Sequence, residues 1–256
     1  MKLFRYITLS LLMISGGAAA EITSTEAFIN SSTNQGKLTQ VMLKNYMLVG
    51  LSVRARKAEQ DLGVAITEYE AAQKEINAYV KTDAVREPLR SANEQWKRVK
   101  GLYLETPSKE NAEKVREQTE LLLKLWNLVT IQIVENTDSH FGPLVSTAGH
   151  VRMLSQRVSS LYALRAWGFD ERYAEAFVST LELFEQKRTE LESSQLNNEQ
   201  IKGELGKIQR DFKRFKELSD QEATKAMLGL IARSSEKITK SMDKVTAMYM
   251  YQGLSF

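Results

Sequence analysis

The chain contains no cysteine, only three prolines and only two histidines among its 256 residues. Without cysteine, the fold has no disulfides, no haem attached through C-x-x-C-H and no thiolate zinc site. The two histidines, His140 and His150, lie in no metal-ligand spacing such as H-E-x-x-H. The scarcity of proline and the many Ala, Leu, Glu, Lys, Gln and Arg residues favour long helices, because these residues lose little side-chain freedom in a helix. We therefore predict an all-α protein.

Motifs that carry catalysis are also missing. The sequence has no G-x-S-x-G elbow, no phosphate-binding loop and no dinucleotide fingerprint. Its acidic residues are mixed with lysine and arginine, as on the solvated faces of helices. We expect a protein that is not an enzyme and that uses no cofactor and no metal.

The first twenty residues have the pattern of a secretory signal peptide. Lys2 and Arg5 precede a short apolar run, and Ala18-x-Ala20 supplies small residues for cleavage. An uncleaved membrane anchor is the alternative, but the run is shorter than the about 20 residues that span a membrane. We predict that residues 1–20 are a signal peptide and that the mature protein is soluble and periplasmic.

The remaining chain is nearly neutral. Removing the signal peptide leaves 33 basic and 32 acidic residues. This balance gives no reason to expect nucleic acid as a partner. No later stretch reaches the about 18 uninterrupted apolar residues of a membrane-spanning helix.

The mature chain matches itself at a constant separation of 116 residues. KLTQVMLKNYMLVG at 37–50 aligns with MLSQRVSSLYALRA at 153–166, and QWKRVKGL at 95–102 aligns with DFKRFKEL at 211–218. The pairs in the first match include Leu38/Leu154, Thr39/Ser155, Gln40/Gln156, Tyr46/Tyr162 and Leu48/Leu164. Matches that share one offset over this distance indicate two tandem copies of one module. Similar composition of leucine-, lysine- and glutamate-rich helices is the alternative explanation.

Helix breakers divide each copy into four predicted helices. In the second copy the breakers are Gly142-Pro143, Gly168-Phe169-Asp170, the SSQLNNEQ turn at 193–200 and Ser219-Asp220, with the first helix beginning near Ser146. In the first copy they are Asp61-Leu62-Gly63, residues 82–88 and Thr106-Pro107-Ser108, with Pro107 just inside a helix start. Short connections make neighbouring helices antiparallel. We predict two tandem antiparallel four-helix modules of about 116 residues, at 21–141 and 142–256.

The stretch VSTAGHVRMLSQRVSSLYAL at 145–164 places polar groups in what is otherwise a core helix. The helical period gives two neighbouring stripes, an apolar one of Val151, Leu154, Val158 and Leu161 and a polar one of Arg152, Ser155, Gln156 and Ser159. A guanidinium, an amide and two hydroxyls near a helix N-terminus suit a small oxyanion or carboxylate. The alternative that the residues alone favour is pairing of Arg152 and Arg157 with carboxylates of neighbouring helices.

This stretch resembles the signature of the PilJ-type sensor domain, the N-terminal domain of type IV pili methyl-accepting chemotaxis transducers. The resemblance is carried by Ala148-Gly149 and by RMLSQR at 152–157. The stretch is also similar to the A-G-x-x-R-M-x-S-x-R box in the periplasmic domain of nitrate/nitrite sensor kinases. The resemblance implies tandem helical modules and a small anion, such as nitrate or nitrite, bound by Arg152 across a homodimer. The ligand-binding residues that it implies are Arg152, Gly149, Ser155, Gln156 and Arg157.

Both copies depart from the family pattern. The second copy has Val145-Ser146 where Ile-Asn is usual and His150 where arginine is common. In the first copy the counterparts of Gly149, Arg152 and Arg157 are Thr33, Gly36 and Val41. A pseudo-dimer of the two copies would hold one key arginine instead of two. Three alternatives follow. The anion site binds more weakly, it forms only when two chains each supply Arg152, or the protein no longer binds the anion.

We expect an exported sensory or ligand-binding protein, because the sequence has neither a second membrane helix nor a cytoplasmic signalling module. It would act through a membrane-bound sensor kinase, chemoreceptor or cyclase. The alternative is a non-catalytic helical interaction or dimerisation protein, in which the RMLSQR box serves packing and no small ligand binds.

Overall fold

The computed structural model describes residues 22–80 and 82–253, and these residues form helices and connecting turns without a β-strand. The predicted all-α class is therefore confirmed. The signal peptide predicted at residues 1–20 lies outside the described residues. The helices are α1 (Thr25–Gly50), α2 (Ala55–Tyr79), α3 (Asp83–Tyr103), α4 (Lys109–Glu135), α5 (Gly142–Leu164), the π-helical turn η1 (Arg165–Phe169), α6 (Asp170–Glu192), α7 (Glu199–Ser219) and α8 (Lys225–Gly253).

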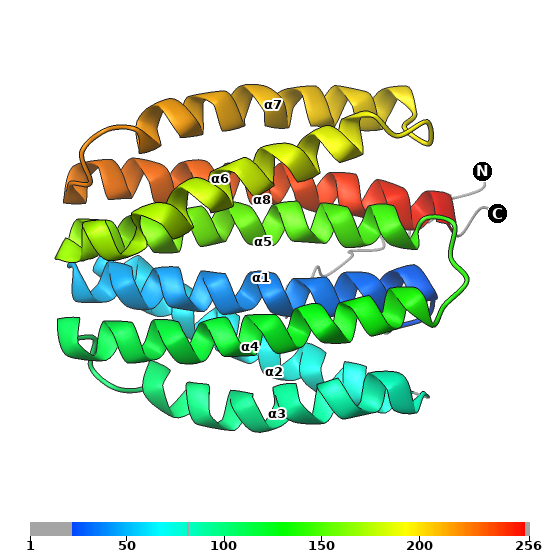
Figure 1. Cartoon of the computed structure of the whole chain (residues 1–256), viewed down its shortest axis with the longest axis horizontal. Helices are drawn as coiled ribbons and strands as arrows, with labels where there is room; N and C mark the ends of the chain where they lie inside the picture. Colours follow the sequence, from blue (N-terminus) through cyan, green and yellow to red (C-terminus); the bar gives the residue numbers. More distant parts are fainter. Residues whose placement is uncertain (1–21, 81, 254–256) are drawn as a thin grey trace, which may run out of the picture.

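Two helices, α1 and α5, run side by side through the middle of the molecule (Figure 1). α2 and α4 pack against α1, and α6 and α8 pack against α5. α3 covers α4 and α7 covers α8, so α3 and α7 form opposite edges of the molecule (Figure 1). In this view α4 and α6 pass in front of α2 and α8. The α1–α5 pair therefore has one groove on each side.

The burial pattern of each helix follows from its place in this arrangement. The edge helix α3 buries one stripe of Val85, Leu89, Ala92, Trp96 and Val99, and α7 buries Ile201, Leu205, Ile208, Phe212 and Phe215. These spacings of three and four residues put apolar side chains on one helical face. The central helix α5 is instead buried on nearly all sides. Its many small and hydroxyl-bearing residues allow neighbouring helices to approach closely.

Side-chain caps fix several helix starts. The hydroxyl of Ser24 accepts a hydrogen bond from the Ala27 amide at 3.1 Å, and Ser108 caps α4 through the amide of Asn111 at 3.1 Å. The Asn198 side chain does the same for α7. Each cap satisfies one amide that would lack a partner in the first helical turn.

The helix starts recur at nearly the spacing of the sequence repeat. The starts of α3 and α7, and those of α4 and α8, are 116 residues apart, whereas those of α2 and α6 are 115 apart. The core contacts follow the same shift, because the Tyr69 and Trp96 rings pack with their centroids 4.1 Å apart and the Phe184 and Phe212 rings stack with theirs 4.1 Å apart. The division into two modules at residues 141 and 142 stays a prediction, which these spacings favour.

One predicted break, near Asp61-Leu62-Gly63, is wrong. α2 runs through it, because an isolated glycine inside a helix costs only about 1 kcal/mol and does not by itself end the helix. The chain instead turns between α1 and α2, where Ser52 and Arg54 adopt left-handed backbone angles, with φ of 57° and 51°. Neither serine nor arginine favours a positive φ, so these residue types did not indicate the backbone angles of this turn.

Smaller differences concern helix ends. α5 begins at Gly142, four residues before the predicted start, with Pro143 in its first turn. Pro107 precedes the cap residue Ser108 instead of lying inside α4. Ser219-Asp220 ends α7, and α8 begins only at Lys225.

The break predicted at Gly168-Phe169-Asp170 is confirmed. Gly168 has φ of 91° within η1, a conformation that only glycine adopts readily. The turn brings the Trp167 ring against the backbone of Gly50 at the end of α1. A membrane-spanning helix is not found among the described residues.

Candidate functional site

The structure places the five predicted ligand-binding residues on α5, but they do not face one common site. Gly149, Arg152, Ser155 and Gln156 are buried, and Arg157 is partly buried. Arg152 contacts α1 and α8, whereas Arg157 contacts α4 and α6. The two arginines therefore serve opposite sides of the α1–α5 pair.

Arg152 is held by three protein groups. Its Nη1 donates to Asp243 Oδ1 at 3.0 Å, and its Nη2 donates to Asn30 Oδ1 at 2.7 Å and Thr33 Oγ1 at 3.1 Å. The side chain is 5% exposed, and this burial lowers the pKa of the guanidinium, while Asp243 raises it. Only Nε lacks a protein partner. Arg152 thus pairs with a carboxylate of a neighbouring helix, which is the alternative to anion binding given in the sequence analysis. Direct binding of an anion by Arg152 stays a prediction.

Arg157 closes the groove between α4 and α6. Its Nη1 lies 2.6 Å from Glu120 Oε2, and its Nε donates to Thr180 Oγ1 at 3.3 Å. The side chain thus joins three helices and occupies the space above α5. This contact is again an ion pair with a neighbouring helix, and it lies on the other side of α5 from Arg152.

Gly149 lets α1 and α5 approach closely. A side chain built at Gly149 would overlap Thr33 of α1. Thr33 and Gly149 are 116 residues apart and are thus counterparts in the repeat. Contact between counterparts is what a two-fold axis between α1 and α5 would produce.

Ser155 and Gln156 face α8 through Thr239. The Gln156 Nε2 atom donates to Thr239 Oγ1 at 2.8 Å, and Ser155 Oγ lies 2.8 Å from the same hydroxyl. Thr239 donates its own proton to the carbonyl of Ser235 at 2.9 Å. Thr239 must therefore accept from Gln156, which fixes the orientation of the amide. The Gln156 Oε1 atom is buried and has no protein partner.

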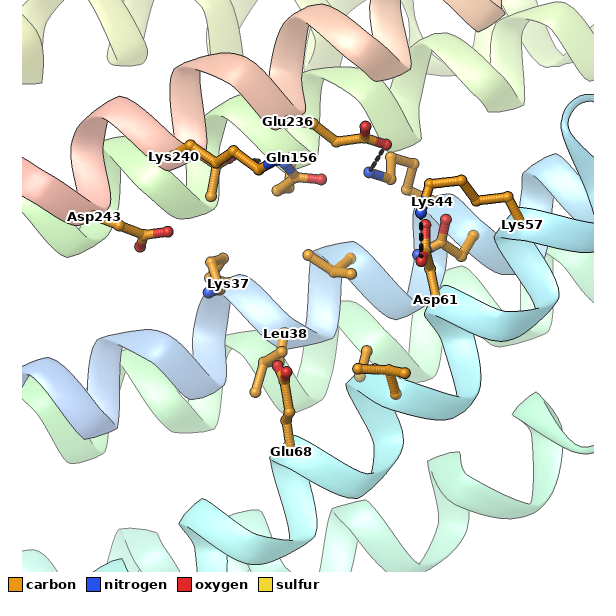
Figure 2. A pocket seen from close by; sticks show the side chains of 15 residues that line it. Lys37, Leu38, Lys44, Lys57, Asp61, Glu68, Gln156, Glu236, Lys240 and Asp243 are labelled. Atoms are coloured by element: carbon orange, nitrogen blue, oxygen red, sulfur yellow. Dashed lines mark hydrogen bonds and ion pairs between the residues drawn. The ribbon is translucent and has the colours of Figure 1, made fainter. Parts of the chain in front are cut away.

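A cavity of about 320 Å³ opens in the groove between α1, α2 and α8, with Gln156 of α5 reaching it (Figure 2). It carries four lysines and four carboxylates, together with apolar and amide side chains. The lining residues are Lys37, Leu38, Val41, Lys44, Asn45, Lys57, Asp61, Val64, Ala65, Glu68, Gln156, Glu236, Thr239, Lys240 and Asp243.

One end of this cavity is internally paired. Lys44 lies 3.5 Å from Glu236, Arg54 lies 3.3 Å from the same carboxylate oxygen, and Lys57 lies 2.9 Å from Asp61. Burial lowers the pKa of the Lys44 ammonium, and Glu236 raises it. These charges largely satisfy one another.

The other end holds Lys37, Lys240 and Asp243 (Figure 2). Within the described chain, Lys37 forms neither a hydrogen bond nor an ion pair, and Asp243 is already bound by Arg152. Burial, followed by the charge of Arg152, lowers the pKa of the Lys37 ammonium, whereas Asp243 and Glu68 raise it. With Asp243 bound by Arg152, two lysines at this end face one remaining carboxylate, Glu68.

A second cavity of about 340 Å³ lies beyond Asp243 and includes Asn30, Arg152, Thr246 and Met250. Asp243 lines both cavities. The Arg152–Asp243 ion pair thus borders the two spaces.

Sequence reasoning missed the lysines and carboxylates of the cavity. Lys37 and Lys44 lie in KLTQVMLKNYMLVG, a stretch interpreted only as half of the repeat. Two lysines in a helix buried on most sides were the available signal, since lysine is seldom buried without a function or a partner. Asp243 and Glu236 gave no such signal, because their helix is rich in charge.

Among residues 22–80 and 82–253, the structure contains no group of three His, Asp or Glu side chains arranged to hold a metal ion. The chain matches no protein-family model, no curated protein and no solved structure.

Proposed function

We propose that this protein is a non-catalytic, exported sensory protein that binds a small ligand with an anionic group in the cavity between α1, α2 and α8. The observation that carries the proposal is the pair of groups in this cavity without a protein partner, the partly exposed Lys37 ammonium and the buried Gln156 oxygen. A buried polar atom without a partner costs about 1–3 kcal/mol. A ligand that supplies the missing partners would remove that cost.

The volume and the lining support ligand binding over a purely structural role. Ligand pockets commonly measure about 300–1,000 Å³, with apolar walls and a few placed polar groups. The 320 Å³ cavity has this size, and its mostly polar and charged lining suits a charged ligand, with Leu38, Val41, Val64 and Ala65 as the apolar part.

This proposal moves the anion from Arg152 to the neighbouring cavity. Both terminal nitrogens of Arg152 already have acceptors, whereas Lys37 has none. Arg152 then positions Asp243, which lines the ligand cavity. Because the cavity walls come from α1, α2 and α8, a bound ligand would change how these helices pack. A membrane-bound sensor kinase, chemoreceptor or cyclase is the proposed reader of this change.

The test fills the cavity from within. Arg157 closes the opposite groove by reaching Glu120, and its counterpart 116 residues earlier is Val41. In the Val41→Arg variant, the new guanidinium is expected to reach Glu236, the counterpart of Glu120, and to occupy the cavity. Thermal shift and calorimetry would be measured with nitrate, nitrite, small carboxylates, amines and amino acids. We expect at least one ligand to bind the unmodified chain and to lose at least tenfold in affinity in Val41→Arg.

The matched control is Val178→Arg, which makes the same change at a valine that is 51% exposed on α6 and lines no described cavity. It should bind as the unmodified chain does. If no compound in the panel binds, or if Val41→Arg binds unchanged, the cavity is not a ligand site.

A further inference from the structure

The charges of the cavity balance as a whole but are unevenly placed. Its four lysines and four carboxylates give a formal lining charge of zero. A simple anion would be attracted by the lysines but repelled by the carboxylates, and a simple cation would be attracted by the carboxylates but repelled by the lysines. A ligand that carries both charges and is itself neutral fits such a lining better than either.

The cationic end defines where the negative group of a ligand would lie. Figure 2 shows Lys37, Lys240 and Asp243 together at this end, away from Lys44 and Asp61. Arg152 neutralises Asp243 at 3.0 Å, so Glu68, which also acts on Lys37, is the one lining carboxylate left for the two lysines. A carboxylate between Lys37 and Lys240 would supply the missing acceptor.

The buried amide defines the second group. The hydrogen-bond network through Thr239 directs the Gln156 nitrogen to α8, so the atom left without a partner is an oxygen. An oxygen acceptor requires a ligand donor, such as an ammonium or a hydroxyl. Glu236 lies beside Gln156 (Figure 2) but is already paired with Lys44 and Arg54, so the requirement for a donor comes from the Gln156 oxygen.

The remaining wall is apolar. Leu38, Val41, Val64 and Ala65 contribute hydrocarbon surface on the α1 and α2 sides. The volume of 320 Å³ is at the lower end of ligand pockets. The space therefore suits one small molecule with a short apolar side chain and excludes a folded peptide or a large cofactor.

We infer that the cavity binds a small zwitterion, with the chemistry of a free α-amino acid that has an apolar side chain. Its carboxylate lies between Lys37 and Lys240, its ammonium donates to Gln156 Oε1, and its side chain contacts Val41 and Ala65. This inference rests on the proposed ligand-binding function and specifies its ligand.

The test compares leucine with molecules that lack one of its groups. Calorimetry on the whole mature chain would use leucine, isocaproate without the amine, isoamylamine without the carboxylate, and the α-hydroxy analogue. Alanine and valine would vary the side chain. We expect leucine or valine to bind at least tenfold more tightly than every analogue.

Two lysine variants locate the carboxylate. Lys37→Met removes the unpaired ammonium and should weaken the amino acid at least tenfold while leaving any weak binding of isoamylamine unchanged. Lys202→Met on α7 is the control, because Lys202 forms a similar exposed ion pair, with Glu199 at 2.8 Å, and lines neither cavity. It should change affinity by less than about twofold, as an ion pair at the surface contributes little.

The outcomes separate the inference from the proposed function. If isocaproate, the α-hydroxy analogue or nitrate binds as tightly as leucine, and Val41→Arg abolishes that binding, the zwitterion inference fails and the ligand site stands. Equal loss in Lys37→Met and Lys202→Met would also overturn the inference. If no probe binds and Val41→Arg changes nothing, both proposals fail.

Discussion

The two grooves beside the α1–α5 pair occupy counterpart positions but are closed in different ways. In the groove between α4 and α6, Arg157 reaches Glu120 at 2.6 Å and Thr180 at 3.3 Å. In the groove between α2 and α8, its counterpart is Val41, and a cavity of about 320 Å³ remains. The long side chain of Arg157 fills its groove, whereas the short side chain of Val41 leaves the other groove open.

The comparison also shows that the RMLSQR stretch contributes to both sides of the α1–α5 pair and not to one common site. Arg157 belongs to the RMLSQR stretch, yet it fills space on one side of the molecule. The two unsatisfied groups lie on the other side, where Lys37 comes from α1 and Gln156 comes from the RMLSQR stretch itself. A motif in one copy and a cavity beside the other are compatible, because α1 and α5 touch along their length.

The largest effect is expected from Arg152→Met, which keeps much of the side-chain volume but removes the charge next to Asp243. Asn30 and Thr33 lose their donor and the carboxylate loses its partner. Breaking a buried pair costs about 3–5 kcal/mol. The Asp243 side chain is 44% exposed, so we expect about 3 kcal/mol of lost unfolding free energy, measured by chemical denaturation. The double variant Arg152→Met with Asp243→Leu should recover part of this loss; no recovery would mean that the pair is not the cause.

A smaller loss of unfolding free energy is expected from Arg157→Val, which places in the groove between α4 and α6 the residue type that Val41 supplies in the other groove. Glu120 is then left mostly buried without its cation, since its side chain is 13% exposed. We expect about 2 kcal/mol of destabilisation. Ligand binding in the other groove should be unchanged, which calorimetry can check. A loss of binding in this variant would show that the two grooves are not independent.

The smallest effect tests the contact between the two copies. Alanine normally stabilises a helix over glycine by about 0.5–1 kcal/mol, but at Gly149 the new methyl group would overlap Thr33. We expect Gly149→Ala to lower the unfolding free energy by about 1 kcal/mol net, because overpacking outweighs the helix preference. Gly203→Ala on α7 is the control, since nothing lies within 4 Å of its added atom. It should stabilise, and equal effects of both changes on the denaturation midpoint would contradict the close contact.

Sequence reasoning found the helical class and most of the turns, because these depend on local chemistry. Ser108 and Gly168 carry their own signals, as a cap and as a left-handed residue. The turn at Ser52 and Arg54 does not, since neither residue type prefers the backbone angles that it adopts.

The candidate site was less accessible from the sequence because it depends on how helices are rotated against each other. The polar stripe of α5 followed from the helical period, but Asp243, the partner of Arg152, is 91 residues away. Whether Asp243 faces α5 or solvent depends on the orientation of α8 about its axis. The cavity likewise depends on Val41 and Ala65 being short at one crossing of helices, which no local pattern marks.

The contact between Thr33 and Gly149 has a further consequence for how such a protein can change. In a symmetric homodimer, the residues that meet on the two-fold axis are encoded once, so both must be small or both must be large. A single chain with two copies encodes them separately. Here Thr33 fills the space that Gly149 leaves, and its hydroxyl accepts a hydrogen bond from Arg152. The tandem arrangement that the repeat predicts would therefore allow each half of an interface to mutate independently, as the counterpart positions Gly36 and Arg152 illustrate.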